Sequence, residues 1–232
     1  MKIFELTPEL YDLQVDWEKR LEKEKDFFID VLRKRNVKSV LDIGCGTGHH
    51  VQLFSNYVER VVGIDPSEDR LGYARENVIR SSNVELVKGG FEDLDRLFTE
   101  QFDLIVSLGN TLPILGNRRK VKLALKSTRR RLVKGGLAIF QFLNFEPKVI
   151  EENRFYYPKI FEKDGIKYIF LKHFEYGKLK TRVDFLTILL SEENNISDFF
   201  VKTSFLCTLR INLFLKMVKN SGFKNIELFG TG

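Results

Sequence analysis

The sequence predicts an α/β fold: a Rossmann-like, doubly wound and mostly parallel sheet with an antiparallel hairpin insertion, a lid, near the C-terminal part. Three observations support this. Short apolar strands alternate strictly with helical segments up to about residue 145, a glycine-rich turn follows the first strand, and the pattern changes to hairpins afterwards. The 232 residues suit one large domain or a core with an added subdomain.

Apolar spacing and turn residues justify each element of the core. Leu13, Trp17, Leu21 and Phe28 recur at helical spacing, and Pro66-Ser67 is a helix start signal. Lys134-Gly135-Gly136 is expected to end the last core helix. We therefore expect strands over 40–43, 60–65, 84–87, 102–108 and 137–142, and helices over 11–32, 49–57, 66–78 and 118–132.

Beyond residue 146 the composition favours antiparallel strands. Four segments rich in Phe, Ile, Val, Thr and Tyr are separated by short turns such as Asp164-Gly165, and they cover 156–160, 167–176, 181–190 and 199–208. A helix over 210–220 and a strand over 223–229 are then expected. The predicted organisation is a core over 1–145, a lid over 146–208, and a return to the core over 209–232.

Composition limits the classes of partner. The net charge of +6 is read as a solvated, lysine-rich surface, with nucleic-acid binding as the alternative. The main basic cluster, between 118 and 134, lies mostly on one face of an amphipathic helix without interleaved aromatic residues. Cys45 and Cys207 form no metal or disulfide pattern, and no apolar run approaches a membrane span. We expect an intracellular, cytoplasmic protein without a metal.

The stretch from Val40 to Gly48 carries the chemistry. Glycines at 44, 46 and 48 between a strand and a helix let a ligand approach the backbone and the helix N-terminus, and Asp65 is placed to bind ribose hydroxyls. The spacing is not the G-x-G-x-x-G of dinucleotide sites. Asp42 would repel a pyrophosphate but favours a cation, so S-adenosyl-L-methionine is preferred over NAD.

Val40 to Gly48 together with Val62 to Ser67 resembles the class I S-adenosylmethionine-dependent methyltransferases, over about residues 35–145. The resemblance implies a seven-stranded sheet with a reversed last strand. Either the strand at 223–229 is the sixth and the sequence stops short of the seventh, or a hairpin strand takes that role. It also implies that the methionine end of the cofactor lies at Asp42 and Gly44, and its ribose at Asp65. Gly46, Pro66 and the adenine-side Phe91 complete this part of the expected cofactor site, with S-adenosyl-L-homocysteine as the product.

A narrower resemblance is to the glycine and sarcosine N-methyltransferase group. Leu108-Gly109-Asn110-Thr111 and Asn144-Phe145-Glu146 follow the fourth and fifth strands at places where that group carries motifs. The resemblance implies that Arg20 meets the methionine carboxylate and that the Leu108 carbonyl meets the ammonium. The expected contacts are completed by Tyr11, Trp17 and Asn110 for the cofactor, and by Asn144 and Arg210 for the substrate. Leu143 replaces the arginine that would bind a glycine-like carboxylate, which leaves the acceptor open.

These patterns predict an S-adenosylmethionine-dependent methyltransferase that acts on a small molecule at nitrogen. Methylation of RNA or protein, and a cofactor-binding protein without turnover, are the alternatives. Because the sulfonium is already activated, alignment and exclusion of water are the main demands on the site. No catalytic base is assigned, although His49, His50 and His173 are considered. The oligomeric state stays open.

Overall fold

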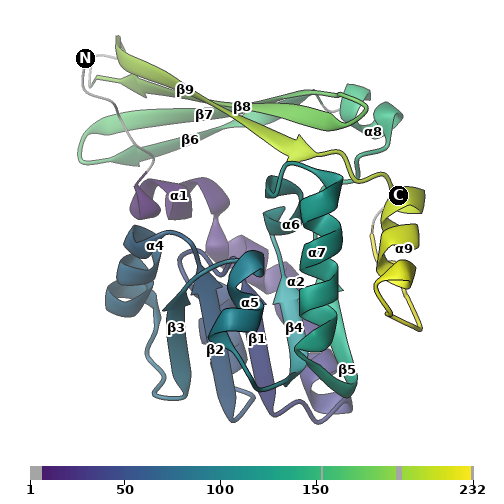
Figure 1. Ribbon diagram of the computed structural model, residues 1–232. Helices are drawn as coiled ribbons and strands as arrows, with labels where there is room; N and C mark the ends of the chain where they lie inside the picture. The colour runs from purple at the N-terminus through teal and green to yellow at the C-terminus, as the bar shows by residue number, and fades with distance from the viewer. Residues whose placement is uncertain (1–6, 153, 192–194, 231–232) are drawn as a thin grey trace.

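The computed structural model describes residues 7–152, 154–191 and 195–230. Two sheets dominate it, a parallel sheet with helices on both faces and an antiparallel sheet lying across one end of the first (Figure 1). This arrangement confirms the expected α/β core and hairpin insertion.

The first sheet has the strand order β3-β2-β1-β4-β5, with every pair parallel. The direction of winding reverses between β1 and β4, and in such sheets ligands bind beyond the carboxyl ends of the strands at this point. The strands are β1 (Ser39–Ile43), β2 (Arg60–Asp65), β3 (Val84–Lys88), β4 (Phe102–Ser107) and β5 (Leu132–Phe140).

Helices cover both faces of this sheet because each carries an apolar stripe. Phe28 and Leu32 of α2 are buried on one side, and Val121 and Leu125 of α7 on the other. The core helices are α2 (Trp17–Lys34), α3 (His49–Ser55), α4 (Glu68–Tyr73) with the π-helical turn η1 (Ala74–Val78), the 3₁₀ turn η2 (Phe91–Asp93), α5 (Leu94–Leu97), α6 (Thr111–Ile114), α7 (Arg118–Arg130) and α9 (Ile211–Asn220).

The N-terminal segment is two helices instead of the single helix predicted over 11–32. Asp16 adopts φ 57° and separates α1 (Pro8–Val15) from α2, and its side chain accepts a hydrogen bond from Lys19 N. The break turns α1 out of the line of α2, so that α1 lies near the carboxyl ends of the strands, next to α4 (Figure 1).

The second sheet has the order β6-β7-β8-β9 and is antiparallel throughout, as predicted. It is formed by β6 (Phe155–Lys163), β7 (Ile166–Glu175), β8 (Lys180–Leu190) and β9 (Ile196–Cys207), after the short α8 (Pro147–Glu152). Helices α1 and α6 lie between the two sheets (Figure 1), where Leu10 of α1 packs against Tyr168 and Phe170. The second sheet therefore covers the carboxyl edge of the first.

Two expected boundaries are wrong. Gly135 and Gly136 do not end a helix but lie within β5, which starts at Leu132 and is irregular opposite Phe102 and Leu104. The segment 223–229 forms no strand, and Asn225 within it has φ 51°. Consequently the described first sheet has five strands, and the seven-stranded sheet implied by the resemblance is not seen in these residues. No described helix is long and apolar enough to cross a membrane.

Candidate functional site

The glycine turn between β1 and α3 has the backbone that the sequence predicts. Gly44, Gly46 and Gly48 all have positive φ, and Gly44 N and Cys45 N both donate to Ile64 O, at 2.8 and 3.0 Å. A Cβ on Gly44 would lie 2.2 Å from Thr111 Cγ2, so no side chain fits at this position. The turn therefore holds a closely approached stretch of backbone at the switch point of the sheet.

Asp42 lies on β1 directly beneath this turn and is 2 % exposed. Its Oδ1 is buried without a hydrogen-bond partner. Burial and the charge of Asp65 raise the pKa of Asp42 to about 7, although Arg20 acts in the opposite direction. A buried, unpaired carboxyl next to open backbone is complementary to a cationic ligand.

Asp65 ends β2 and holds two backbone segments together. Its Oδ2 accepts from Gly46 N at 3.0 Å and its Oδ1 from Ser67 N at 2.9 Å, across the exposed Pro66. Each carboxylate oxygen has a further lone pair, so Asp65 can also accept from a bound hydroxyl. Asp65 therefore lies beside the glycine turn, and its contact with a ribose stays a prediction.

Asp12 of α1 ties the N-terminal segment to the glycine turn. Its Oδ1 accepts from Thr47 Oγ1 at 2.6 Å and from Trp17 Nε1 at 2.8 Å, while its Oδ2 is 2.7 Å from His49 Nε2. The rings of Trp17 and His49 stack at 4.5 Å. Sequence reasoning missed Asp12, because nothing distinguishes it from the other acids of a charged helix.

Arg20 of α2 reaches the carboxyl ends of β4 and β5. Its Nη2 donates to Gln141 Oε1 at 2.9 Å, its Nε contacts Glu24, and its guanidinium lies 4.9 Å from the centre of the Trp17 ring. Nη1 makes no hydrogen bond with the described residues. Arg20 is therefore fixed in place with one nitrogen left to donate.

Glu24 balances this cation. Burial alone would raise its pKa, but hydrogen bonds with His50 and Gln141 and the charge of Arg20 outweigh burial and lower the pKa to about 2. Burial lowers the pKa of His50, which favours the neutral imidazole 2.8 Å from Glu24. His50 thus belongs to the support of Arg20.

Tyr11 and Phe91 lie at different depths. Arg70 packs over the Tyr11 ring at 4.8 Å, and burial raises the pKa of the Tyr11 hydroxyl. Phe91 is 4 % exposed in the main core, and its carbonyl accepts from Ser127 Oγ. Phe91 therefore has a clear packing role, and its ring is not presented on the surface.

Leu108 and Asn110 shape the loop after β4. The Leu108 carbonyl, expected to meet an ammonium, accepts from Thr111 Oγ1 at 2.8 Å and from Thr111 N at 3.3 Å. Asn110 has φ 73°, and its Oδ1 accepts from Leu143 N at 2.7 Å. An ammonium would have to share the Leu108 carbonyl with Thr111.

The two expected substrate residues both converge on Glu146. Asn144 Oδ1 accepts from Glu146 N at 3.0 Å, which makes Asn144 a turn residue, and Arg210 Nε donates to Glu146 Oε2 at 3.0 Å. Arg210 also precedes α9, whose Ile211 N donates to Glu146 Oε1. In this structure they connect the loop after β5 with α9.

Lys172 is the main residue that sequence reasoning missed. On the second sheet it lies opposite Tyr156 on one side and Phe185 on the other, and its ammonium is 5.6 Å from the Phe185 ring centre. Burial, together with the charges of Lys159 and Arg20, lowers the pKa of Lys172 to about 8. No carboxylate among the described residues forms an ion pair with it. Strand alternation could have predicted that Lys172 lies on the covered face, but it could not have predicted that Lys172 lacks a counter-charge.

The three histidines have separate environments. His49 and His50 pair with acids near the start of α3, whereas His173 lies 3.2 Å from Asp184 on the second sheet. Phe174 is buried in the core, so its neighbour His173 faces outward, away from the glycine turn. Among the described residues, no group of three or more His, Cys, Asp or Glu could hold a metal ion.

Comparison with known proteins shows which family and which relatives this chain is similar to. Residues 40–136 match the family described as "Methyltransferase domain". The chain is 33% identical over 139 residues to a glycine/sarcosine/dimethylglycine N-methyltransferase of Actinopolyspora halophila, covering 59% of this chain and 24% of that protein. It is 25% identical over 224 residues to a glycine/sarcosine N-methyltransferase of Halorhodospira halochloris, covering 95% and 78%.

The fold comparison extends over nearly the whole chain. The crystal structure of Streptomyces venezuelae DesVI superposes with a TM-score of 0.77 at 20% identity, covering 93% of this chain and 89% of that one. At this identity the likeness concerns the fold. The matched residues 40–136 include the glycine turn and Asp65, so the domain match falls on the same part of the chain as the candidate site.

Proposed function

We propose that this protein transfers the methyl group of S-adenosylmethionine to a nitrogen atom of a small molecule. The observation that carries the proposal is the buried Asp42 carboxyl, whose Oδ1 has no partner in the protein and lies beneath the glycine turn. A ligand that is cationic near this point and carries a ribose near Asp65 satisfies both acids. When bound, S-adenosylmethionine supplies a methyl group already activated on a sulfonium sulfur.

The residues around the turn suit the parts of that cofactor. Arg20 Nη1 is available to donate to a carboxylate, and Glu24 and Gln141 hold the guanidinium in position. Asp65 retains lone pairs for ribose hydroxyls while it fixes Gly46 and Ser67. Trp17, held by Asp12, places an aromatic ring beside Arg20. We assign Phe91 only a backbone or packing role beside the adenine.

The acceptor is expected under the second sheet, which covers the carboxyl edge. Tyr156, Lys172 and Phe185 form one row on the covered face of that sheet. An amine nucleophile must arrive neutral, and like charge from Lys172 disfavours a protonated amine nearby. The relatives that methylate glycine and sarcosine support nitrogen as the acceptor atom. The cytoplasmic location stays a prediction from the sequence.

Titration with S-adenosylhomocysteine by calorimetry tests the cofactor site. Arg20→Met should weaken binding about 10- to 100-fold, as expected for loss of a charge-assisted hydrogen bond. Arg33→Met, an exposed change on the same helix, should leave it unchanged. Equal effects of the two variants, or no binding by the wild type, would contradict the proposal.

A labelled-methyl screen then tests the acceptor. Label is expected in small amines, and label found only in RNA or protein fractions would replace this proposal by the alternative of macromolecular methylation. Arg119, Lys122 and Lys126 on α7 are exposed and would serve such a substrate, whereas Arg130 and Arg131 pair with Asp95. Salt-sensitive binding to transfer RNA would be its first sign.

A further inference from the structure

The face of the second sheet that points away from the core is largely apolar; we call it the outer face. Cross-strand pairing defines its rows, because side chains directly opposite each other point to the same side. From β6 to β9, one row is Ile160, Ile169, Ile188 and Phe199; the next is Leu171, Leu186 and Val201; a third is Phe155, His173, Asp184 and Thr203; a fourth is Glu175, Arg182 and Phe205.

Exposure of these rows is unusual for a sheet that already packs one face on a core. Phe155 is 70 % exposed, Phe199 64 %, and Phe205 54 %, with Ile160 and Val201 in the same range. An antiparallel sheet with one buried face normally alternates apolar and polar side chains. Here the alternation is lost, and contiguous exposed apolar surface of this kind marks an interaction site.

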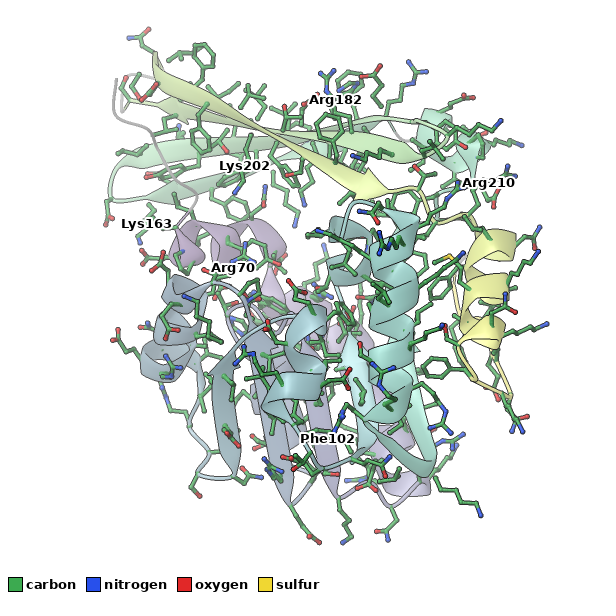
Figure 2. All side chains as sticks on the ribbon, in the orientation of Figure 1. Arg70, Phe102, Lys163, Arg182, Lys202 and Arg210 are labelled. Atoms are coloured by element: carbon green, nitrogen blue, oxygen red, sulfur yellow. The ribbon has the colours of Figure 1, made fainter. Side chains whose placement is uncertain are left out.

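The polar members of the outer face satisfy one another. Arg182 donates to both oxygens of Asp184, at 2.7–3.0 Å, and to Glu175 Oε2 at 3.0 Å. Thr203 Oγ1 donates to Asp184 Oδ1 at 2.7 Å, and His173 lies 3.2 Å from Asp184. Figure 2 shows Arg182 on the side of the sheet opposite to Lys202, which extends toward the core. Arg182 therefore pairs with both carboxylates of the cluster, and these polar side chains are already hydrogen-bonded within one chain.

We propose that the outer face is the interface between two copies of this chain, packed sheet against sheet. A two-fold axis places the same patch on both subunits, so a largely apolar face can pack on its own copy without a second, complementary surface. Four strands at about 4.8 Å and seven residues at about 3.3 Å give roughly 450 Å² in plan. The projecting rings raise the accessible area toward the ~800 Å² per partner of a standard interface.

Sedimentation equilibrium tests this proposal with the full chain. The wild type should have twice the 27.2 kDa chain mass. Phe199→Lys and Val201→Glu each place a charge among the exposed apolar side chains of the interface twice, once per copy, and should raise the dissociation constant ~100-fold or more. Leu123→Lys, an equally exposed apolar residue on α7, is the matched control and should remain dimeric.

Far-UV circular dichroism and urea unfolding at low concentration check that each variant folds. Because both substituted side chains are solvent-facing in the single chain, their monomers should retain the wild-type spectrum. A wild type that stays monomeric at every concentration overturns the proposal, as does a dimer that both variants leave intact. Conversion to a folded monomer by either variant, but not by Leu123→Lys, supports it.

Discussion

Replacement of Asp42 by Asn should stabilise the ligand-free protein while impairing its cofactor site. The carboxyl is buried and its Oδ1 has no partner, so the folded protein must either keep a proton on it or hold an unpaired charge. Asn is nearly isosteric and removes the charge. The substitution therefore isolates the electrostatic cost of Asp42 from its packing.

The size of the effect follows from the shift of the Asp42 pKa from 3.8 to about 7. In an unfolded chain Asp42 loses its proton near pH 4, whereas in the folded protein it keeps it until about pH 7. The folded state is thus penalised progressively between these values and by a constant amount above them. About three pKa units correspond to about 4 kcal/mol of unfolding free energy.

Urea unfolding of wild type and D42N across this pH range measures the difference. We expect little difference near pH 4 and a gain for D42N approaching 4 kcal/mol above about pH 7. Asp69→Asn, an exposed acid on α4, should show no such trend. A D42N curve parallel to that of the wild type at all pH values would refute the reasoning. Binding of S-adenosylmethionine should also strengthen with rising pH in the wild type and lose this dependence in D42N.

Three further perturbations have defined outcomes. Lys172→Met should raise the unfolding free energy by about 3 kcal/mol near neutral pH, because the folded protein holds an unpaired ammonium whose pKa is lowered from 10.5 to about 8. This gain should fade as the pH rises from about 8 to 10.5. Urea unfolding at several pH values measures it, and a gain that is the same at every pH would contradict the reasoning. Asp12→Asn should cost about 1–3 kcal/mol through its bonds to Thr47, Trp17 and His49, as measured by thermal unfolding against the exposed Asp26→Asn. Gly44→Ala should destabilise more than Gly46→Ala, since both have positive φ but only Gly44 would collide with Thr111, and equal losses in chemical denaturation would exclude that clash.

Much of the fold could be predicted from the sequence because its signals are local. The apolar runs of β1, β2 and β4 and the glycines between β1 and α3 require no knowledge of distant neighbours. The segment 223–229 shows the limit of such signals. It has strand-forming residues, but a strand needs a paired edge; instead Phe223 and Ile226 pack on the core, and Asn225 has a left-handed conformation.

The candidate site also combines residues with a local sequence signal and residues whose roles depend on tertiary contacts. Asp42 and the glycines could be predicted because their spacing along one β-turn-α unit encodes their geometry, and Asp65 because it ends the next strand. Asp12 and Lys172 could not be found in this way, because their roles depend on which residues tertiary folding brings near them. The break at Asp16, which brings Asp12 to the glycine turn, is also decided by tertiary contacts, since the helical periodicity runs through it.

The alternation of β7 restricts how its sequence can change in length. Lys172 and His173 are neighbours in the chain but belong to opposite faces, one toward the core and one outward. Insertion of a single residue upstream in this strand would move the side chains of each face to the opposite face. Outer-face side chains would then point to the carboxyl edge of the first sheet. Substitutions can therefore accumulate on one face without altering the other, whereas gains and losses of residues are confined to connections such as Asp164-Gly165. Natural variation in length among homologous chains should accordingly cluster in these turns and be rare inside the four strands.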